Sequence, residues 1–232
     1  MAAVRKVAIL QSNYIPWKGY FDLTAAVDEL ILYDDVQYTK NDWRNRNRIK
    51  TPNGVAWLTI PVGATIGRTV REVRLPDSRW RDLHWRTLVH NYRRARHFAE
   101  VAPMLEPLYR SDRFDTLSGF NRALIETVCG YLSIRTRLSD VRDYRPEGDR
   151  IQRLVSLCLQ AGAAEYVTGP SAAAYLDASI FHDNGLAVTW FDYAGYPPYP
   201  QLWGGFEHHV TVLDLLFNCG PEAPDYMKHV RS

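Results

Sequence analysis

The order of strand, polar turn, helix and strand at the start of this chain constrains its fold more than any other feature. The apolar run KVAIL (6–10) predicts a short buried strand, and ELILYDDVQY (29–38) predicts a second. Between them, FDLTAAVD (21–28) has the apolar spacing of a helix. Strands that are joined through a helix pair in parallel, with a right-handed crossover. We therefore expect an α/β fold that begins with a β-loop-α-β unit on a parallel sheet.

The rest of the chain predicts a hairpin and several helical segments. The turn sequence PNG (52–54) between two strand-like runs predicts a β-hairpin, and VREVRL (70–75) predicts one more strand. Helical spacing begins at Trp80, with four apolar residues roughly on one face: Leu83, Leu88, Tyr92 and Phe98. Further helices are expected within residues 101–111, 116–134, 148–163 and 210–220, and a last buried strand at 186–193. The whole chain, residues 1–232, is expected to be one α/β domain with a helical insertion around residues 80–145.

Composition fits a globular protein and argues against several other classes. Apolar residues make up 46% of the 232 residues, which is enough for a large core. Charged residues make up 23%, which is close to the value for an ordinary globular protein. The net charge of +2 is too small to indicate nucleic acid binding, and no apolar run approaches the roughly 18 residues of a membrane span. The start MAAVRKVAILQ lacks the features of a signal peptide. We expect a cytoplasmic protein that binds neither nucleic acid nor membranes.

Three cysteines at wide spacing give no sign of a disulfide framework or a zinc site. They are Cys129, Cys158 and Cys219, and none belongs to a CxxC pair. A lone cysteine on an apolar helix is by default a core residue. A core role is clearly favoured for Cys129 and Cys158, and only narrowly favoured over a reactive role for Cys219.

The turn after the first strand, QSNYIPWKGYF (11–21), carries far more aromatic surface than a turn needs. In open α/β sheets, ligands bind beyond the carboxyl ends of the strands, and DDVQYTK (34–40) follows a second such end. Hydrogen-bonding, charged and aromatic candidates for a pocket there are Gln11, Asn13, Tyr14, Trp17, Lys18, Tyr20, Asp34, Asp35, Gln37 and Lys40. The alternative is a structural loop with an aromatic staple.

Two basic segments are candidate anion or partner sites. In YTKNDWRNRNRI, the side chains of Lys40, Arg44, Arg46 and Arg48 could hold a phosphate or a carboxylate, with Asn45 beside them. The alternation could equally be the solvated face of an edge strand. Residues 79–97 carry six Arg and three His against one Asp. This helix could dock an acidic protein partner, although a plain solvated face explains it as well.

The C-terminal segment offers an acid–base group. Glu207, His208 and His209 precede a predicted helix, and adjacent imidazoles with a carboxylate suit a general base. Cys219 is a candidate thiolate nucleophile, although its place near a helix C-terminus disfavours an anion. Further metal ligands at usual spacings are absent from the sequence, so we expect no metal.

Several separated motifs together resemble the WbqC-like family. They are QSNYIPWKGYF, DDVQYTKNDWRNRNRIK with WLTIPV, YVTGPSAAAYLD and DLLFNCGPE, in this order along nearly the whole chain. Members of the family occur among genes for O-antigen and natural-product assembly, including antibiotic biosynthesis. The resemblance therefore implies a tailoring role in small-molecule biosynthesis. One branch that the chain also resembles contains the lincosamide condensing enzymes, transferases that join a carrier-protein thioester to the amine of an amino sugar.

The resemblance implies amide-bond formation from a carrier-protein thioester to a small-molecule amine. His209 or His208 would be the base and Glu207 would orient it, with either an acyl-enzyme on Cys219 or direct aminolysis. The donor would arrive on the phosphopantetheine arm of an acyl or peptidyl carrier protein, without a tightly bound cofactor. Its docking residues would be Arg86, Arg93, Arg94 and Arg96. The acceptor would be held by Tyr175, Tyr199 and Gln201.

A more distant likeness is to nucleotidyltransferases of the HIGH superfamily, which share this Rossmann-like order of elements. The tetrapeptide WKGY stands where that superfamily carries HxGH, but Trp17 and Tyr20 replace both histidines and cannot be cationic. Nucleotidyl transfer is thus one alternative function, and a non-catalytic module that binds a carrier protein or a glycan is another. The leading hypothesis requires that the N-terminal turn and the C-terminal His segment line a single cavity.

Overall fold

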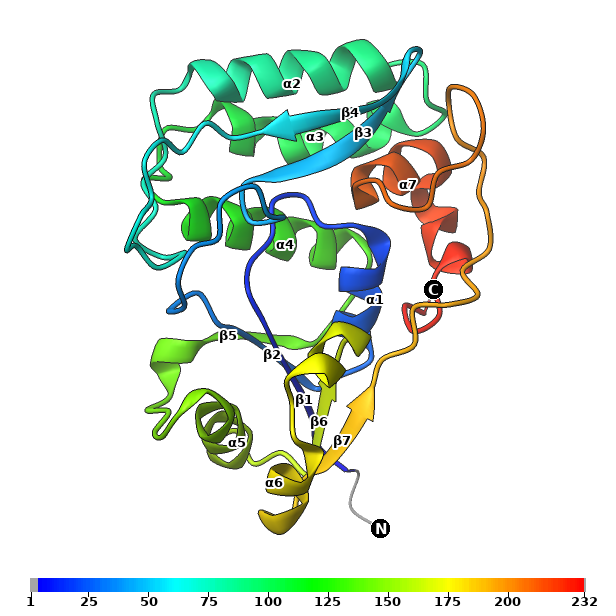
Figure 1. Cartoon of the computed structure of the whole chain (residues 1–232). Helices are drawn as coiled ribbons and strands as arrows, with labels where there is room; N and C mark the ends of the chain where they lie inside the picture. The colour runs from blue at the N-terminus through cyan, green and yellow to red at the C-terminus, as the bar shows by residue number, and fades with distance from the viewer. Residues whose placement is uncertain (1–3, 232) are drawn as a thin grey trace.

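The computed structural model describes residues 4–231 and is built around a five-stranded parallel sheet (Figure 1). The strands are β1 (Lys6–Leu10), β2 (Glu29–Leu32), β5 (Arg137–Asp140), β6 (Glu165–Thr168) and β7 (Ala187–Trp190). Their order is β5-β2-β1-β6-β7, and every neighbouring pair is parallel. The expected parallel α/β architecture is confirmed. The order changes direction between β1 and β6, which places the switch point of the sheet beside the turn that follows β1.

Alternation along β1 directs its side chains into two apolar clusters. Ala8 packs into one cluster with residues of α1 (Lys18–Ala25), α4 (Leu117–Tyr131) and α7 (Val212–Cys219). Val7 and Ile9 belong to the other cluster, which takes its helical residues from α5 (Arg150–Gln160) and α6 (Ala178–Asp183). Successive strand side chains point to opposite faces, so the sheet is covered by helices on both sides.

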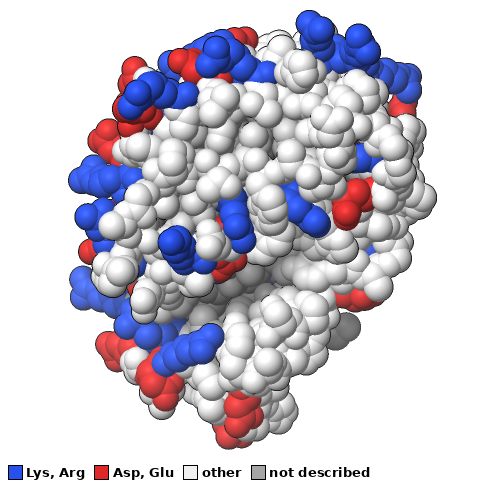
Figure 2. All heavy atoms as spheres, turned by 45° about the horizontal axis from the view of Figure 1, so that its top comes forward, with Lys and Arg blue, Asp and Glu red and all other residues white. Residues whose placement is uncertain are grey.

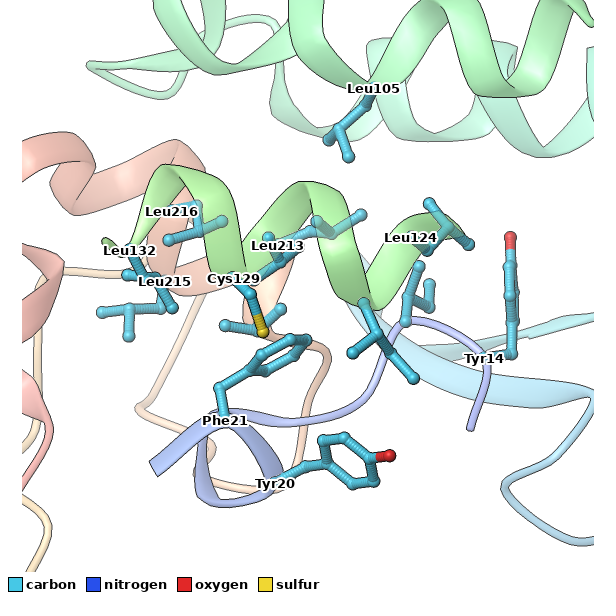
Figure 3. Packing of buried hydrophobic residues seen from close by; sticks show 14 of the residues in the cluster. Tyr14, Tyr20, Phe21, Leu105, Leu124, Cys129, Leu132, Leu213, Leu215 and Leu216 are labelled. Carbon is cyan, nitrogen blue, oxygen red and sulfur yellow. The ribbon is translucent and has the colours of Figure 1, made fainter. Parts of the chain in front are cut away.

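The larger cluster is centred on α4. Figure 3 shows Cys129 of α4 pointing toward Phe21 of α1, while Leu105 of α3 (Phe98–Arg110) approaches from the other side. Three leucines of α7 lie alongside: Leu213, Leu215 and Leu216. Both Phe21 and Leu105 are completely buried. Helix α4 therefore joins the sheet layer to the helices above it.

A hairpin of β3 (Arg46–Thr51) and β4 (Gly54–Thr59) lies under α2 (Arg79–Tyr92), as Figure 1 shows. The hairpin expected from PNG is confirmed, and Gly54 at φ +100° occupies the left-handed region that favours glycine. The Tyr92 hydroxyl accepts a hydrogen bond from the backbone N–H of Lys50, which ties α2 to the hairpin. Short 3₁₀ helices complete the chain: η1 (Val141–Asp143), η2 (Pro170–Ala174) and η3 (Gly220–Tyr226).

Two expected strands differ from the structure. The second strand ends at Leu32 rather than residue 38, because the carboxylate of Asp34 turns inward. Residues 70–75 form turns instead of a strand, since Val70 and Val73 are both buried three residues apart. Strand β7 is shorter than expected and largely exposed, because it forms the edge of the sheet and only Val188 packs beneath it. The sequence patterns did not predict β5.

The helical region also differs in detail. The helical pattern expected from Trp80 to Phe98 ends at Tyr92 in α2, and the helix expected within residues 101–111 begins earlier, at Phe98, in α3. Pro103 and Pro107 both lie inside α3. Leu83 was expected on the apolar face of α2 but is 57% exposed. The buried face of α2 instead carries Trp80, His84, Trp85, Leu88, Asn91 and Tyr92.

Asp34 fastens the turn after β1 to the core. Its buried carboxylate accepts hydrogen bonds from the Ser12 N–H (2.8 Å), the Ser12 hydroxyl (2.6 Å) and the Ser118 hydroxyl of α4. Asp34 was predicted to bind substrate, but in the structure its oxygens accept hydrogen bonds from these internal donors.

We expect Asp34→Ala to lower the free energy of unfolding by about 3 kcal/mol, because buried donors in the turn after β1 and on α4 lose their acceptor. Urea denaturation followed by circular dichroism measures this change. The matched control is Asp77→Ala, which removes an exposed ion pair with Arg79 and should leave the midpoint unchanged. Equal midpoints for the two variants would contradict the anchoring role.

Candidate functional site

Three segments that are distant in sequence meet beside the switch point of the sheet. The backbone N–H of Val212 donates to the carbonyl of Pro16 (2.8 Å), and the N–H of Thr211 donates to the carbonyl of Arg48 (2.9 Å). Trp17 and Thr211 form an isolated antiparallel bridge. The start of α7 is thereby joined to both the turn after β1 and the hairpin. The expectation that the N-terminal turn and the C-terminal His segment come together is confirmed.

The turn itself is strained. Ile15 has φ +37°, a conformation that is rare for a β-branched residue and costs of order 1–3 kcal/mol. The amide of Asn47 holds it there by donating to the carbonyls of Tyr14 (3.1 Å) and Ile15 (2.9 Å). The N–H of Tyr14 donates to the carbonyl of Trp43 (3.0 Å). Strain that several contacts maintain is characteristic of binding and catalytic sites.

These segments enclose a cavity of about 160 Å³. It is lined by Asn13, Pro16, Trp17, Trp43, Asn47 and His209. The rings of Trp17 and His209 lie 5.8 Å apart, so an aromatic wall stands next to an imidazole. Asn13 accepts one weak hydrogen bond from Arg44 (3.4 Å), which leaves its amide group available to a ligand. Aromatic walls with a few polar groups are typical of small-molecule sites.

A larger and more open hollow of about 640 Å³ lies near the opposite end of β1 and β6. Lys6 and Glu165 on its wall pair with each other at 3.2 Å. The only imidazole among its lining residues is that of His229, and this ring has no carboxylate partner within residues 4–231. The smaller cavity is therefore the stronger candidate, since it contains an imidazole that a carboxylate orients.

His209 and Glu207 form an acid–base pair at this cavity. The Nδ1 atom of His209 lies 3.3 Å from Glu207 Oε1, which leaves Nε2 as the free nitrogen. The backbone N–H of His209 (2.8 Å) and, more weakly, the Arg48 guanidinium lower the pKa of Glu207 and keep it ionised. His208 instead packs edge-on against Phe206 at 4.5 Å, and burial together with the Lys18 charge lowers its pKa. The geometry thus favours His209 over His208 as the base.

A buried carboxylate supports the loop that carries this pair. Asp214 accepts hydrogen bonds from the hydroxyls of Tyr92 and Tyr199 and from the Gln201 amide, all at 2.8 Å. Burial raises the pKa of Asp214 despite these donors. Gln201 in turn bonds both backbone groups of Glu207. Tyr199 and Gln201 were predicted to hold the acceptor, but the structure uses them to position the loop.

Lys18 is buried without a carboxylate partner among the described residues. It is 3% exposed, and its ammonium lies 4.9 and 5.0 Å from the ring centres of Tyr196 and Tyr199. Its single hydrogen bond goes to the Pro197 carbonyl at 3.3 Å. Burial lowers the pKa of Lys18 to about 8. Lys18 is therefore an interior residue that follows the cavity residue Trp17 in the chain but does not itself line the cavity.

Three more predicted substrate-binding residues are structural. Tyr14 is fully buried, and its hydroxyl bonds His84 and Tyr109 at 2.8 Å each. Tyr20 is 4% exposed within the main apolar cluster. Asn45 is buried and donates to the Ile60 carbonyl. In the structure these side chains contribute mainly to internal packing and hydrogen bonding, and none of them lines the cavity.

Other predicted residues lie outside the cavity lining. Asp35 is ion-paired with Arg71, and Gln37 and Lys40 are exposed on the loop beyond it. Tyr175 is exposed on the segment after β6, where the Arg150 guanidinium covers its ring at 4.1 Å. Gln11 is half-buried, and its backbone carbonyl accepts from the Tyr20 hydroxyl. Of the residues predicted to bind substrate, Asn13 and Trp17 line the cavity directly, and Arg44 contacts it through Asn13.

Cys219 has the environment of a core residue. It is 2% exposed, and burial raises the pKa of its thiol to about 12. It is also absent from the cavity lining. This argues against the acyl-enzyme route, because the thiolate is the nucleophilic form and would be scarce. Cys129 and Cys158 are buried with similarly raised pKa values, as expected.

Trp43 and Asn47 line the cavity although they were not among the predicted candidates. The alternating RNRNRI run contained the signal for Asn47, since Arg46 and Arg48 point outward and Asn47 must then point inward. For Trp43, the sequence shows no periodicity from which its position could have been read.

The surface of the molecule combines a hollow with basic side chains. Figure 2 shows a groove across one face, with Lys and Arg side chains standing above it. The four arginines of the predicted docking surface are exposed: Arg86, Arg93, Arg94 and Arg96. Arg96 is ion-paired at 3.5 Å with Glu222. The end of α2 is connected to the His209 loop, because Trp203 Nε1 donates to the carbonyl of Asn91 at 3.0 Å.

Residues 4–231 contain neither a cluster of metal ligands nor a helix suited to a membrane. No three His, Cys, Asp or Glu side chains in this part of the chain come together as ligands for a metal ion. None of the described helices combines the length and the apolar composition needed to cross a bilayer.

This chain belongs to the WbqC-like protein family, whose model matches residues 11–226. It is 53% identical over 230 residues to the uncharacterized protein Rv1507c of Mycobacterium tuberculosis. That alignment covers 98% of this chain and 100% of the relative. No solved structure matches the chain. The resemblance noted in the sequence is thus confirmed at the level of the family.

The burial of the thiols predicts their reactivity. We expect the native protein at pH 8 to resist a thiol-reactive dye, because all three cysteines are buried and protonated. The same protein in urea should be labelled at three sites. Mass spectrometry of the digested protein identifies the sites. Rapid labelling of Cys219 in the native state would restore the covalent route.

Proposed function

We propose that this WbqC-like protein forms an amide bond by transferring an acyl or aminoacyl group from a carrier-protein thioester to a small-molecule amine. The observation that carries the proposal is the Glu207–His209 pair on an aromatic-walled cavity, at 3.3 Å between Oε1 and Nδ1. Such a pair suits proton transfer at neutral pH.

Direct aminolysis is the route that fits these side chains. The amine nitrogen attacks the thioester carbonyl carbon, and His209 Nε2 accepts the proton that the nitrogen loses. The carbon–sulfur bond then breaks, and the thiolate of the carrier arm leaves and receives that proton. Glu207 keeps the imidazole oriented and stabilises its cationic form. The route needs no protein nucleophile, which agrees with the burial of Cys219.

The donor side of the proposal uses the basic surface of α2. Carrier proteins are acidic and carry a phosphate on the phosphopantetheine arm, so exposed arginines suit their docking. Arg93 and Arg94 have no ion-pair partner among the described residues. The C-terminal end of α2 is connected through Trp203 to the loop that carries His209, and this contact supports the choice of that end as the docking surface.

We expect His209→Ala to lower kcat by about 10²–10⁴-fold, the usual contribution of a general base. The assay is a reconstitution with a loaded carrier protein and an amino sugar, with the amide product measured by mass spectrometry. Glu207→Gln should cost less, since it removes only the charge that orients the imidazole. The control is His182→Ala on α6, an exposed histidine away from the cavity. Unchanged turnover in both His208→Ala and His209→Ala would remove the assignment of the base.

We expect the double variant Arg93→Glu, Arg94→Glu to raise the KM for the carrier protein about tenfold at low salt with kcat unchanged, because charge steers docking and not chemistry. The difference should shrink as salt is raised. The double variant Arg135→Glu, Arg145→Glu, at two exposed arginines elsewhere on the molecule, is the control with the same change in charge. An equal KM for the three proteins would contradict docking at the C-terminal end of α2.

A second candidate function is nucleotidyl transfer, and the strand order favours it. The order β5-β2-β1-β6-β7 places the turn after β1 at the switch point, where doubly wound sheets such as the proposed HIGH-superfamily fold bind nucleotides. Against it, Tyr20 is buried and Trp17 packs on Tyr193 at 5.2 Å, so neither offers charge to a phosphate. A thermal-shift screen with ATP and CTP distinguishes nucleotidyl transfer from amide formation, since ligand at 100 times its Kd adds about 2.7 kcal/mol of stability.

Carrier binding that survives His209→Ala, in a protein that shows no turnover, would instead favour a non-catalytic binding module.

A further inference from the structure

Two tryptophans beside the cavity are exposed to an unusual degree. Trp43 is 41% exposed and Trp57 is 46% exposed, and their ring centres lie 5.5 Å apart at 36°. Trp43 also lines the cavity, and Trp57 stands on β4 directly opposite Arg48. Indoles provide more apolar surface than other side chains, so a pair left in solvent next to a cavity indicates a binding surface.

The turn that carries Trp43 is fixed by contacts from three other elements. Its carbonyl accepts from the N–H of Tyr14, and the next carbonyl, of Arg44, accepts from the Asn121 amide of α4 at 2.8 Å. The guanidinium of Arg46 donates to the carbonyl of Asn41. The indole is therefore in place before a ligand arrives, which lowers the ordering cost of binding.

The edge of this tryptophan pair is positively charged. The Arg46 guanidinium lies 4.4 Å from the centre of the Trp57 ring, and that of Arg48 lies 6.0 Å away. Within residues 4–231, the only acidic partner of Arg48 is Glu207 at 3.8 Å, and Arg46 has none. The surface thus combines an exposed aromatic pair with two guanidinium groups, of which Arg46 has no acidic partner among the described residues and Arg48 has only Glu207 at 3.8 Å.

We propose that Trp43 and Trp57 form a platform for a pyranose ring of the acceptor, and that Arg46 and Arg48 bind a negatively charged substituent on that sugar. A pyranose presents a face of C–H groups bordered by hydroxyls, which matches an indole face bordered by amide and guanidinium donors. The cavity of about 160 Å³ holds only a small group, so a larger acceptor extends onto this surface. The identification of this sugar as the acceptor rests on the proposed function, whereas the binding of the sugar does not.

The test is equilibrium binding, followed by titration calorimetry and by tryptophan fluorescence. The probes are glucosamine 1-phosphate, glucosamine, inorganic phosphate and AMP. We expect glucosamine 1-phosphate to bind most tightly and Trp57→Ala to weaken it at least about tenfold. Arg48→Gln should weaken glucosamine 1-phosphate but leave glucosamine unchanged. Trp57→Phe, which retains an aromatic face, should fall between wild type and Trp57→Ala.

The matched control is Trp190→Ala, which removes a tryptophan of similar exposure (39%) on the edge strand β7 and should leave binding unchanged. Failure of both sugars to bind, or equal loss in the Trp57 and Trp190 variants, would overturn the platform. Equal binding of glucosamine and its phosphate would overturn the anionic substituent. AMP binding that exceeds sugar phosphate binding and depends on Trp57 would overturn the pyranose and indicate a nucleobase. Because binding needs no donor, tight sugar binding without amide product would count against the proposed function alone.

Discussion

The candidate site depends on the backbone hydrogen bonds by which α7 joins the turn after β1 to the hairpin. Val212 bonds Pro16 and Thr211 bonds Arg48, so one helix start holds two segments from the other end of the chain. These bonds bring the His209 imidazole next to the Trp17 indole. Without them, the acid–base pair and the aromatic wall would belong to separate surfaces, and neither would define a site.

Buried carboxylates organise the surroundings of the cavity without entering it. Asp34 fixes the turn to α4, and Asp214 fixes the His209 loop through Tyr199 and Gln201. Each receives several hydrogen bonds, as a buried carboxylate requires. The chemistry is thereby left to Glu207, which is partly exposed and remains ionised. This division explains why acidic residues in the N-terminal motifs are structural, although they resemble ligands in the sequence.

Local patterns were sufficient for most of the fold, and much less so for the site. KVAIL and the PNG turn indicated a strand and a hairpin because a short buried apolar run and turn chemistry act over a few residues. The meeting of Trp17 with His209 could be expected because the aromatic turn follows a strand end, where sites gather. The burial of Tyr14 and Cys219, and the exposure of Trp43, could not be read from the sequence. Each depends on contacts with elements far along the chain, such as Tyr109 for Tyr14.

The left-handed conformation of Ile15 has a consequence for how the protein folds. The contacts that hold it come from Asn47 of the hairpin, while α7 holds the adjoining Pro16, so the turn is complete only after both the hairpin and the last helix have docked on it. Ligand recognition is therefore expected to emerge as a late step of folding, when the C-terminal segment joins the turn. The amides around Ile15 should accordingly exchange with solvent through partial openings that undock α7 while the central strands stay protected.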